Sequence, residues 1–204
     1  TAPRDDQPEG KQNGIHLTAM QILGTIANEV DKILIWKFLG PAHLAVYTLA
    51  LDIPDHISCP QKGIGELAFP KFAAQTPEQI RKNLPALWRK LALYALVLFS
   101  VSLLYMFAAP YIFQFFFPQY MESVSYSQWL ALSLVTGVAA IPNALLAAQK
   151  KMKIQYVIST VQPIMTIGLL VVLIPLYGIM GAIIALLLSR LATIVTYIAA
   201  VRTL

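Results

Sequence analysis

The sequence predicts an all-α integral membrane protein, and three observations indicate it. Of the 204 residues, 57% are hydrophobic and only 12% are charged, whereas soluble domains average about 25% charged residues. The mean hydropathy is +0.64. Apolar stretches of about 20 residues recur along the chain, which is the length that crosses a hydrocarbon core of roughly 30 Å.

The chain divides into a polar tail and a membrane region. Residues 1–16, "TAPRDDQPEGKQNGIH", are rich in Pro, Gly and Asp and predict a solvated linker. Residues 17–204 predict one lobe of six transmembrane helices. Because the chain begins at Thr1, we expect it to be a piece of a longer protein. The six expected spans lie at about 17–39, 44–69, 89–116, 127–149, 154–175 and 179–201.

The basic residues sort onto one side of these spans. The connections after the second and fourth spans and the end of the chain contain Lys71, Arg81, Lys82, Arg89, Lys90, Lys150, Lys151, Lys153 and Arg202. The alternate connections, "GPAH", "FPQYMESVSYSQ" and "LYGI", contain no Lys or Arg, although Lys37 closely precedes the first. The positive-inside rule then predicts that both ends of this segment are cytoplasmic.

Local signals support two of the boundaries. Thr76, Pro77 and Gln79 form the pattern of a capped helix start, so we expect a cytoplasmic surface helix that runs into the third span. "YGIMG" predicts a tight turn between the fifth and sixth spans.

The second span is unusually polar. The stretch "LALDIPDHISCPQKGIGEL" contains Asp52, Asp55, His56, Lys62 and Glu66. Together with Ala45, Thr48, Cys59 and Gly63, these residues fall at steps of three or four, which predicts one polar helix face. The first span has a similar stripe that includes Asn28, Glu29 and Lys32, with Asp31 beside it, and Arg190 lies near the middle of the sixth.

A charge at the centre of a bilayer costs at least about 2.5–3.5 kcal/mol. We therefore expect these groups to line a water-filled interior or to pair within the bundle. Two pairs lie close enough in sequence to neutralise each other, Glu29 with Lys32 and Asp55 with Lys62. His56 beside Asp55 is a candidate for proton coupling. Asn143, after Pro142, is expected to bind a ligand or to satisfy a helix kink.

Several function classes receive little support from the sequence. The pI is near 9.3, but the Lys and Arg residues cluster in short connections between the apolar stretches. No basic face interleaved with aromatic residues, as in nucleic-acid-binding proteins, is present in the sequence. Cys59 is the single cysteine, and with His56 it supplies too few ligands for a structural zinc site. No catalytic constellation is present, so we do not expect an enzyme and expect no cofactor apart from a coupling ion.

"DKILIWKFLGPAHLAVYTLA" (31–50) resembles the start of the second half of bacterial polysaccharide flippases of the O-antigen and capsule type. Asp31, Leu39-Gly40 and Tyr47 match the pattern of that family. "FPKFA", "AAQKKMK" and "YGIMGAIIALLLSRL" resemble its later landmarks in the same order. These proteins share a superfamily with multidrug and toxin extrusion transporters and the lipid II flippase. Ala45, where the family often has Gly, and the charge density of the second span depart from the pattern.

The resemblance implies one half of a two-lobed transporter of roughly 12–14 helices in the bacterial cytoplasmic membrane. Such proteins move an undecaprenyl-diphosphate-linked oligosaccharide across the bilayer by alternating access coupled to an ion gradient. The expected partners are therefore the bilayer, this lipid-linked sugar and an N-terminal six-helix lobe. If the chain were complete, it would have to dimerise to close the cavity.

The candidate site residues follow from this interpretation. Side chains expected to bind the diphosphate or the sugar are Lys32, Lys62, Arg190, Asn28 and Asn143. Candidates for binding a coupling Na⁺ or H⁺ are Glu29, Asp31, Asp52, Asp55, His56 and Glu66.

Three alternatives stay open. A multidrug cation exporter of the same superfamily would have a cavity of net acidic character, whereas acids and bases in these spans nearly balance. A membrane transferase acting on polyprenyl phosphates would show an acidic Mg²⁺ motif in a cytoplasmic loop, and the cytoplasmic loops here are basic. A purely structural subunit would not need the charges within the spans.

Overall fold

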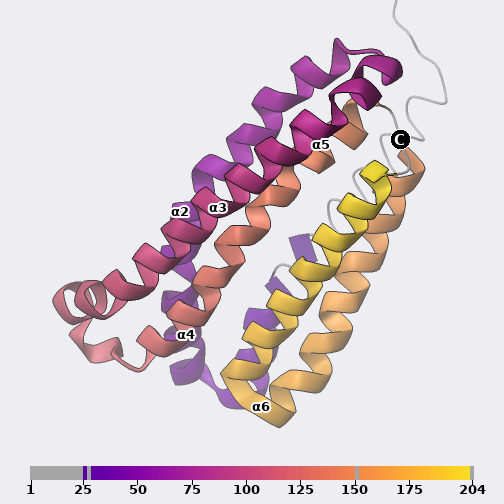
Figure 1. The fold of residues 1–204 in the computed structure, drawn as a ribbon. Coiled ribbons are helices and arrows are strands. Elements are labelled where there is room, and N and C mark those ends of the chain that lie inside the picture. The colour runs from indigo at the N-terminus through magenta and orange to yellow at the C-terminus, as the bar shows by residue number, and fades with distance from the viewer. Residues whose placement is uncertain (1–24, 27–28, 150–151, 203–204) are drawn as a thin grey trace, which may run out of the picture.

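The chain folds into a bundle of long helices (Figure 1). The computed structural model describes residues 25–26, 29–149 and 152–202, and these contain helices and turns but no strand. Residues 29–39 are helical. The remaining elements are α2 (Pro41–Ala73), α3 (Pro77–Phe116), η1 (Pro118–Tyr120), α4 (Ser123–Ala131), η2 (Leu132–Ala139), α5 (Ala140–Ala148) and α6 (Met152–Arg202).

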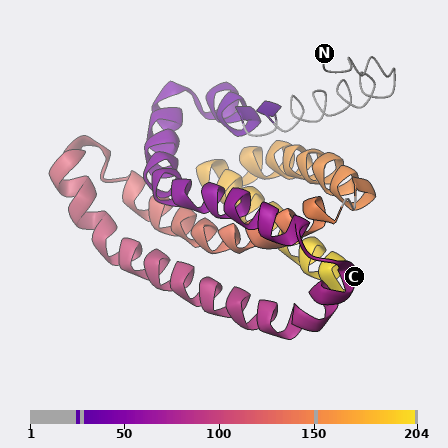
Figure 2. The ribbon, with the colours of Figure 1, turned by 90° about the horizontal axis from the view of Figure 1, so that it is seen from above.

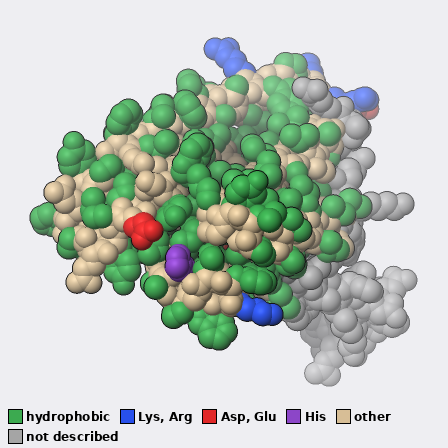
Figure 3. All heavy atoms as spheres, turned by 90° about the horizontal axis from the view of Figure 1, so that it is seen from below, with side chains coloured by type: hydrophobic (Ala, Val, Ile, Leu, Met, Phe, Trp, Pro, Cys, Tyr) green, Lys and Arg blue, Asp and Glu red, His purple; other side chains and the backbone are tan. Residues whose placement is uncertain are grey.

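The connections gather at the two ends of the bundle. The turn between α2 and α3, the facing ends of α5 and α6, and the end of α6 lie at the end marked C in Figure 1. The start of α2, the connection between α3 and α4 and the turn of α6 lie at the opposite end. Figure 3 shows that this opposite end is covered mainly by hydrophobic and uncharged polar side chains. The turn that follows Lys71 and the end of α6 therefore share one end of the molecule, whereas the predicted orientation in the membrane stays a prediction.

The central element is the continuous helical rod formed by α4, η2 and α5, which packs against α2, α3 and α6. Figure 2 shows most of α3 running along the outside of the bundle, while its first turns share an apolar core with the end of α6. Polar bonds join neighbouring helices: Ser102 of α3 donates to the Ala131 carbonyl at 2.7 Å, and Ser123 of α4 donates to the Val46 carbonyl of α2 at 3.0 Å. Such bonds are the usual polar contacts between helices in lipid.

The long element α6 is a hairpin. Its backbone leaves helical geometry at Gly178, with φ 60° and ψ −138°, a conformation that is essentially confined to glycine. The chain reverses there, and the two legs run back alongside each other (Figure 1). The predicted turn in "YGIMG" is confirmed at this residue.

Three helices are long and apolar enough to cross a membrane, judged by length and composition: Glu78–Phe116, Ser123–Ala148 and Val157–Val201. The third contains the turn at Gly178. α2 is not among them, because its polar residues from Asp52 onward lower its hydropathy. Large apolar side chains on α3 and α6 are exposed, which suits contact with lipid. The structure thus supports a membrane protein with transmembrane helices, whereas the full set of six spans stays a prediction.

Observed boundaries extend beyond the expected spans. α2 begins and ends several residues outside 44–69, and α3 begins well before residue 89, because the surface helix and the third span are one continuous helix. The predicted capping box at its start is confirmed. Gln79 N–H donates to Thr76 Oγ1 at 3.4 Å, and Thr76 N–H donates to Gln79 Oε1 at 3.1 Å.

Replacing Thr76 with alanine is expected to lower the free energy of unfolding by about 1 kcal/mol, because the side-chain acceptor for the Gln79 N–H is lost. Thr76→Ser keeps that acceptor and is expected to stay close to wild type. Denaturation of the purified protein in detergent, followed by circular dichroism, measures the difference. Equal stabilities of the two variants would contradict the capping role.

Candidate functional site

A polar cavity of about 490 Å³ lies inside the bundle. Its described walls come from the 29–39 helix, α2, η2, α5 and the second leg of α6. The lining residues are Glu29, Asp31, Lys32, Leu51, Asp55, Ser58, Gln61, Ser133, Thr136, Gly137, Ala140, Leu186 and Arg190.

The cavity lies at mid-length, between two apolar cores. One core joins residues such as Tyr47, Leu130 and Ile183, and the other joins residues such as Leu145 and Tyr197. Along the central rod, the cavity residues at 133–140 fall between Leu130 and Leu145. On the second leg of α6, the cavity residues at 186–190 likewise fall between the two cores. The polar groups are therefore held at the depth that is furthest from both ends of the bundle.

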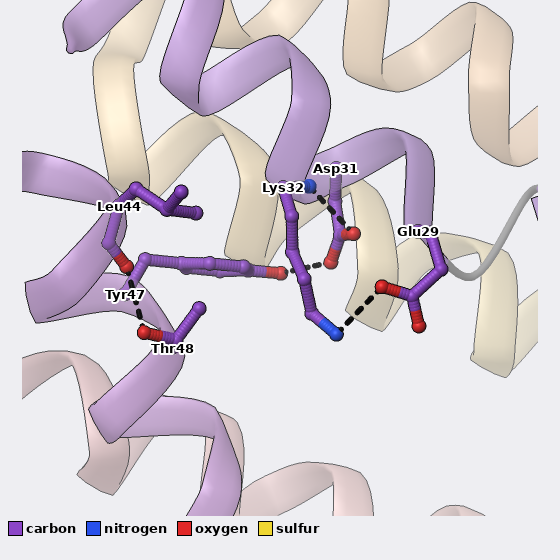
Figure 4. Close-up of polar contacts among 6 residues, drawn as sticks. All are labelled: Glu29, Asp31, Lys32, Leu44, Tyr47 and Thr48. Atoms are coloured by element: carbon purple, nitrogen blue, oxygen red, sulfur yellow. Dashed lines mark hydrogen bonds and ion pairs between the residues drawn. The ribbon is translucent and has the colours of Figure 1, made fainter. Parts of the chain in front are cut away.

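Asp31 is the most deeply buried charged side chain of the site. It is 2% exposed, and it accepts a 2.5 Å hydrogen bond at Oδ2 from the hydroxyl of Tyr47, which is fully buried. Its other oxygen accepts the backbone N–H of Lys32 at 2.7 Å. Figure 4 shows the Tyr47 ring of α2 pointing at the carboxylate from the neighbouring helix. The hydrogen bond between Tyr47 and Asp31 joins the 29–39 helix to α2 at the edge of the cavity.

Lys32 and Glu29 form an ion pair beside this bond, with Lys32 Nζ 2.9 Å from Glu29 Oε2 (Figure 4). The predicted pairing of these two residues is confirmed. The Glu29 side chain is 56% exposed and that of Lys32 33% exposed. Because exposed pairs contribute only about 0–1 kcal/mol, this bridge can open at little cost when a charged ligand competes for Lys32.

Arg190, on the second leg of α6, is the second cation of the described cavity lining, together with Lys32. Asp55 of α2 supplies a third carboxylate. The described lining thus contains two cations and three acids, a nearly balanced set that can take both an anionic group and a small cation.

Neutral hydrogen-bonding groups complete the walls. The Ser58 hydroxyl donates to the Asp55 carbonyl at 2.7 Å, and the Thr136 hydroxyl donates to the Ser133 carbonyl. Their oxygens keep lone pairs that can accept hydrogen bonds from a ligand. The carboxamide of Gln61 lies over Gly137, where a Cβ atom would overlap it. The sequence reasoning missed these four polar residues, although the spacing of three between Ser133 and Thr136 was a usable signal.

Only part of the expected polar face of α2 lines the cavity. Leu51, Asp55 and Ser58 belong to the described lining at helical spacing. Asp52, His56 and Glu66 are exposed and are not part of that lining. His56 Nδ1 lies 2.7 Å from the Asp52 carbonyl. The described lining thus includes Asp55 and does not include these three side chains, and the role expected for them in ion coupling stays a prediction.

The remaining predicted residues are not part of the cavity wall that the structure describes. Asn143 is exposed on α5 and does not line the cavity. Asn28 and the side chain of Lys62 lie outside the described residues, so the pairing of Lys62 with Asp55 stays a prediction. Within the described part of the chain, no group of three or more His, Cys, Asp or Glu side chains is arranged to hold a metal ion.

Together these features define a class: a helical bundle with membrane-length apolar helices around a polar cavity of mixed charge. The chain matches no protein-family model, no curated protein and no solved structure.

Proposed function

We propose that the protein is a membrane transporter that moves a lipid-linked oligosaccharide across the bacterial cytoplasmic membrane. The observation that carries this proposal is the cavity of mixed charge at mid-length of a bundle built from membrane-length helices. Polar groups at this depth are costly against hydrocarbon, so in membrane proteins they mark the path of a polar substrate. The undecaprenyl-diphosphate carrier is inferred from the family resemblance.

The residues divide by chemistry. Lys32 and Arg190 bind the diphosphate, since cations form charge-assisted hydrogen bonds to phosphate oxygens. Gln61, Ser58 and the hydroxyls of η2 bind sugar hydroxyls. Asp31, Asp55 and Glu29 are the groups for a coupling Na⁺ or H⁺, and Glu29 releases Lys32 when the substrate phosphate arrives. No covalent step is needed.

In this proposal the chain is one six-helix lobe, and the N-terminal lobe of the same transporter covers the open side of the cavity. That lobe also covers the exposed side chains of α2 that would be costly against lipid, namely Asp52, His56 and Glu66. Alternating access then exposes the cavity to each side of the membrane in turn.

The proposal is tested with the full-length protein in proteoliposomes, by following the appearance of a fluorescent undecaprenyl-diphosphate oligosaccharide in the opposite leaflet. Arg190→Ala is expected to slow this movement about tenfold to a hundredfold, since a hydrogen bond to a charged group contributes about 1.5–3 kcal/mol. Lys82→Gln, an exposed cation of α3 outside the cavity, serves as the matched control. Movement of an organic cation in place of the lipid-linked sugar would overturn the proposal in favour of a drug exporter.

A further inference from the structure

The first half of α3 has two distinct faces. Its inner face packs on the core at the basic end through Ile80, Leu84, Leu87 and Trp88. The opposite face is exposed and combines cations with apolar groups: Arg81, Lys82, Pro85, Ala86, Arg89, Lys90 and Leu93. α3 contributes no residue to the described wall of the central cavity. This outer face therefore belongs to a different surface of the molecule.

A hollow of about 490 Å³ lies on this outer face. Its described lining is Pro85, Ala86, Arg89, Lys90 and Leu93. The lining is almost entirely apolar, so Arg89 and Lys90 contribute to it mainly through the carbon atoms of their side chains.

Neither Arg89 nor Lys90 forms an ion pair within the described part of the chain, where the single bridge joins Lys32 to Glu29. Glu78 is the one acidic residue of α3. The positive charge of Arg89 and Lys90 is therefore available to an outside anion.

The apolar part of the surface continues along the same helix toward the middle of the bundle. Leu93, Leu96, Val97 and Leu104 are all at least half exposed. Because α3 is one of the three helices that are long and apolar enough to cross a membrane, this strip, which follows the two cations in the sequence, suits contact with lipid acyl chains.

We propose that this face of α3 is a binding site for one anionic phospholipid, with the headgroup phosphate between Arg89 and Lys90 and the acyl chains along Leu93, Leu96 and Leu104. The charge and the apolar strip complement the two parts of such a lipid, in the order in which the lipid presents them. A second copy of the chain would bring like charges together, and a water-soluble acidic partner would leave the strip uncovered. The site does not depend on the proposed transport activity.

The test uses the full-length protein in mixed micelles that contain equal amounts of phosphatidylglycerol and phosphatidylcholine, with the retained lipid identified by mass spectrometry. Wild type is expected to retain phosphatidylglycerol preferentially. R89Q/K90Q is expected to weaken that retention about tenfold or more, because two cations near a membrane surface are removed. R81Q/K82Q removes the same charge from the same face outside the hollow and is expected to keep the preference.

A second variant separates the lipid from a bare anion. Leu93→Gln keeps both cations and is expected to weaken retention of phosphatidylglycerol, because the acyl chains lose apolar contact. Equal loss in R89Q/K90Q and R81Q/K82Q would overturn the proposal, since it would mean a diffuse basic surface. Displacement of the lipid by inorganic phosphate, or unchanged retention in Leu93→Gln, would also overturn it. Circular dichroism confirms that each variant keeps its helices.

Discussion

Gly181→Ala is expected to lower the free energy of unfolding by about 3 kcal/mol, at the upper end of the range for overpacked positions. A Cβ atom at Gly181 would overlap the carbonyl oxygen of Leu173 on the other leg of α6, and Ile174 N would lie 3.1 Å from it. Backbone atoms cannot rotate away as a side chain can. The two legs must then separate, and the core that includes Leu170 and Ile183 loses contact.

Gly168 provides the matched control, because it lies on the same element and a Cβ atom there would meet nothing within 4 Å. Gly168→Ala is expected to stabilise the helix by about 0.5–1 kcal/mol through its higher helix propensity. Unfolding in detergent and limited proteolysis of the 175–182 region compare the two variants. Wild-type stability of Gly181→Ala would show that the legs are not in the close contact described.

Asp31→Ala is expected to have the second large effect and to lower the free energy of unfolding by about 3 kcal/mol. It leaves the buried Tyr47 hydroxyl without its acceptor and removes the acceptor for the Lys32 N–H. Each unsatisfied buried group costs about 1–3 kcal/mol. Tyr47→Phe, which removes the hydroxyl and leaves a carboxylate that water and Lys32 can still reach, is expected to cost about 1–2 kcal/mol.

The two variants form a double-mutant cycle. The double variant is expected to be more stable than the sum of the single effects predicts, by about 1 kcal/mol or more, because the bond can be lost only once. Asp52→Ala is the control, because Asp52 is an exposed acid of α2. Its free energy of unfolding is expected to stay within about 0.5 kcal/mol of wild type. Strictly additive effects would show that Asp31 and Tyr47 do not interact.

Much of the fold follows from local sequence. The apolar stretches predicted the helices, and Thr76, Gln79 and Gly178 predicted a helix start and a turn that the structure confirms. These features depend on contacts between residues that are neighbours along the chain, so a single sequence carries enough information to find them. Helix ends were less accurate, since α2 runs from Pro41 to Ala73 where a span at about 44–69 was expected.

The site was predicted only in part. Lys32, Arg190, Glu29, Asp31 and Asp55 were expected and do line one cavity. Asp52, His56, Glu66 and Asn143 were expected with them and are not part of the described lining, because the rotation of each helix about its own axis decides which polar side chains face the cavity. Tyr47 entered only as a landmark of the family resemblance, whereas the structure makes it the buried partner of Asp31.

By itself, the sequence determined that the chain is helical and apolar enough for a membrane, and it located the start of α3 and the turn of α6. Tertiary structure alone decided which polar side chains share a cavity and which face outward. The physical reason is that helix formation and hydropathy are sums over neighbouring residues, whereas a cavity depends on the rotation of each helix about its own axis. That rotation is set by packing against residues far away in the sequence, such as Leu130 against Ile183, and no local pattern encodes it.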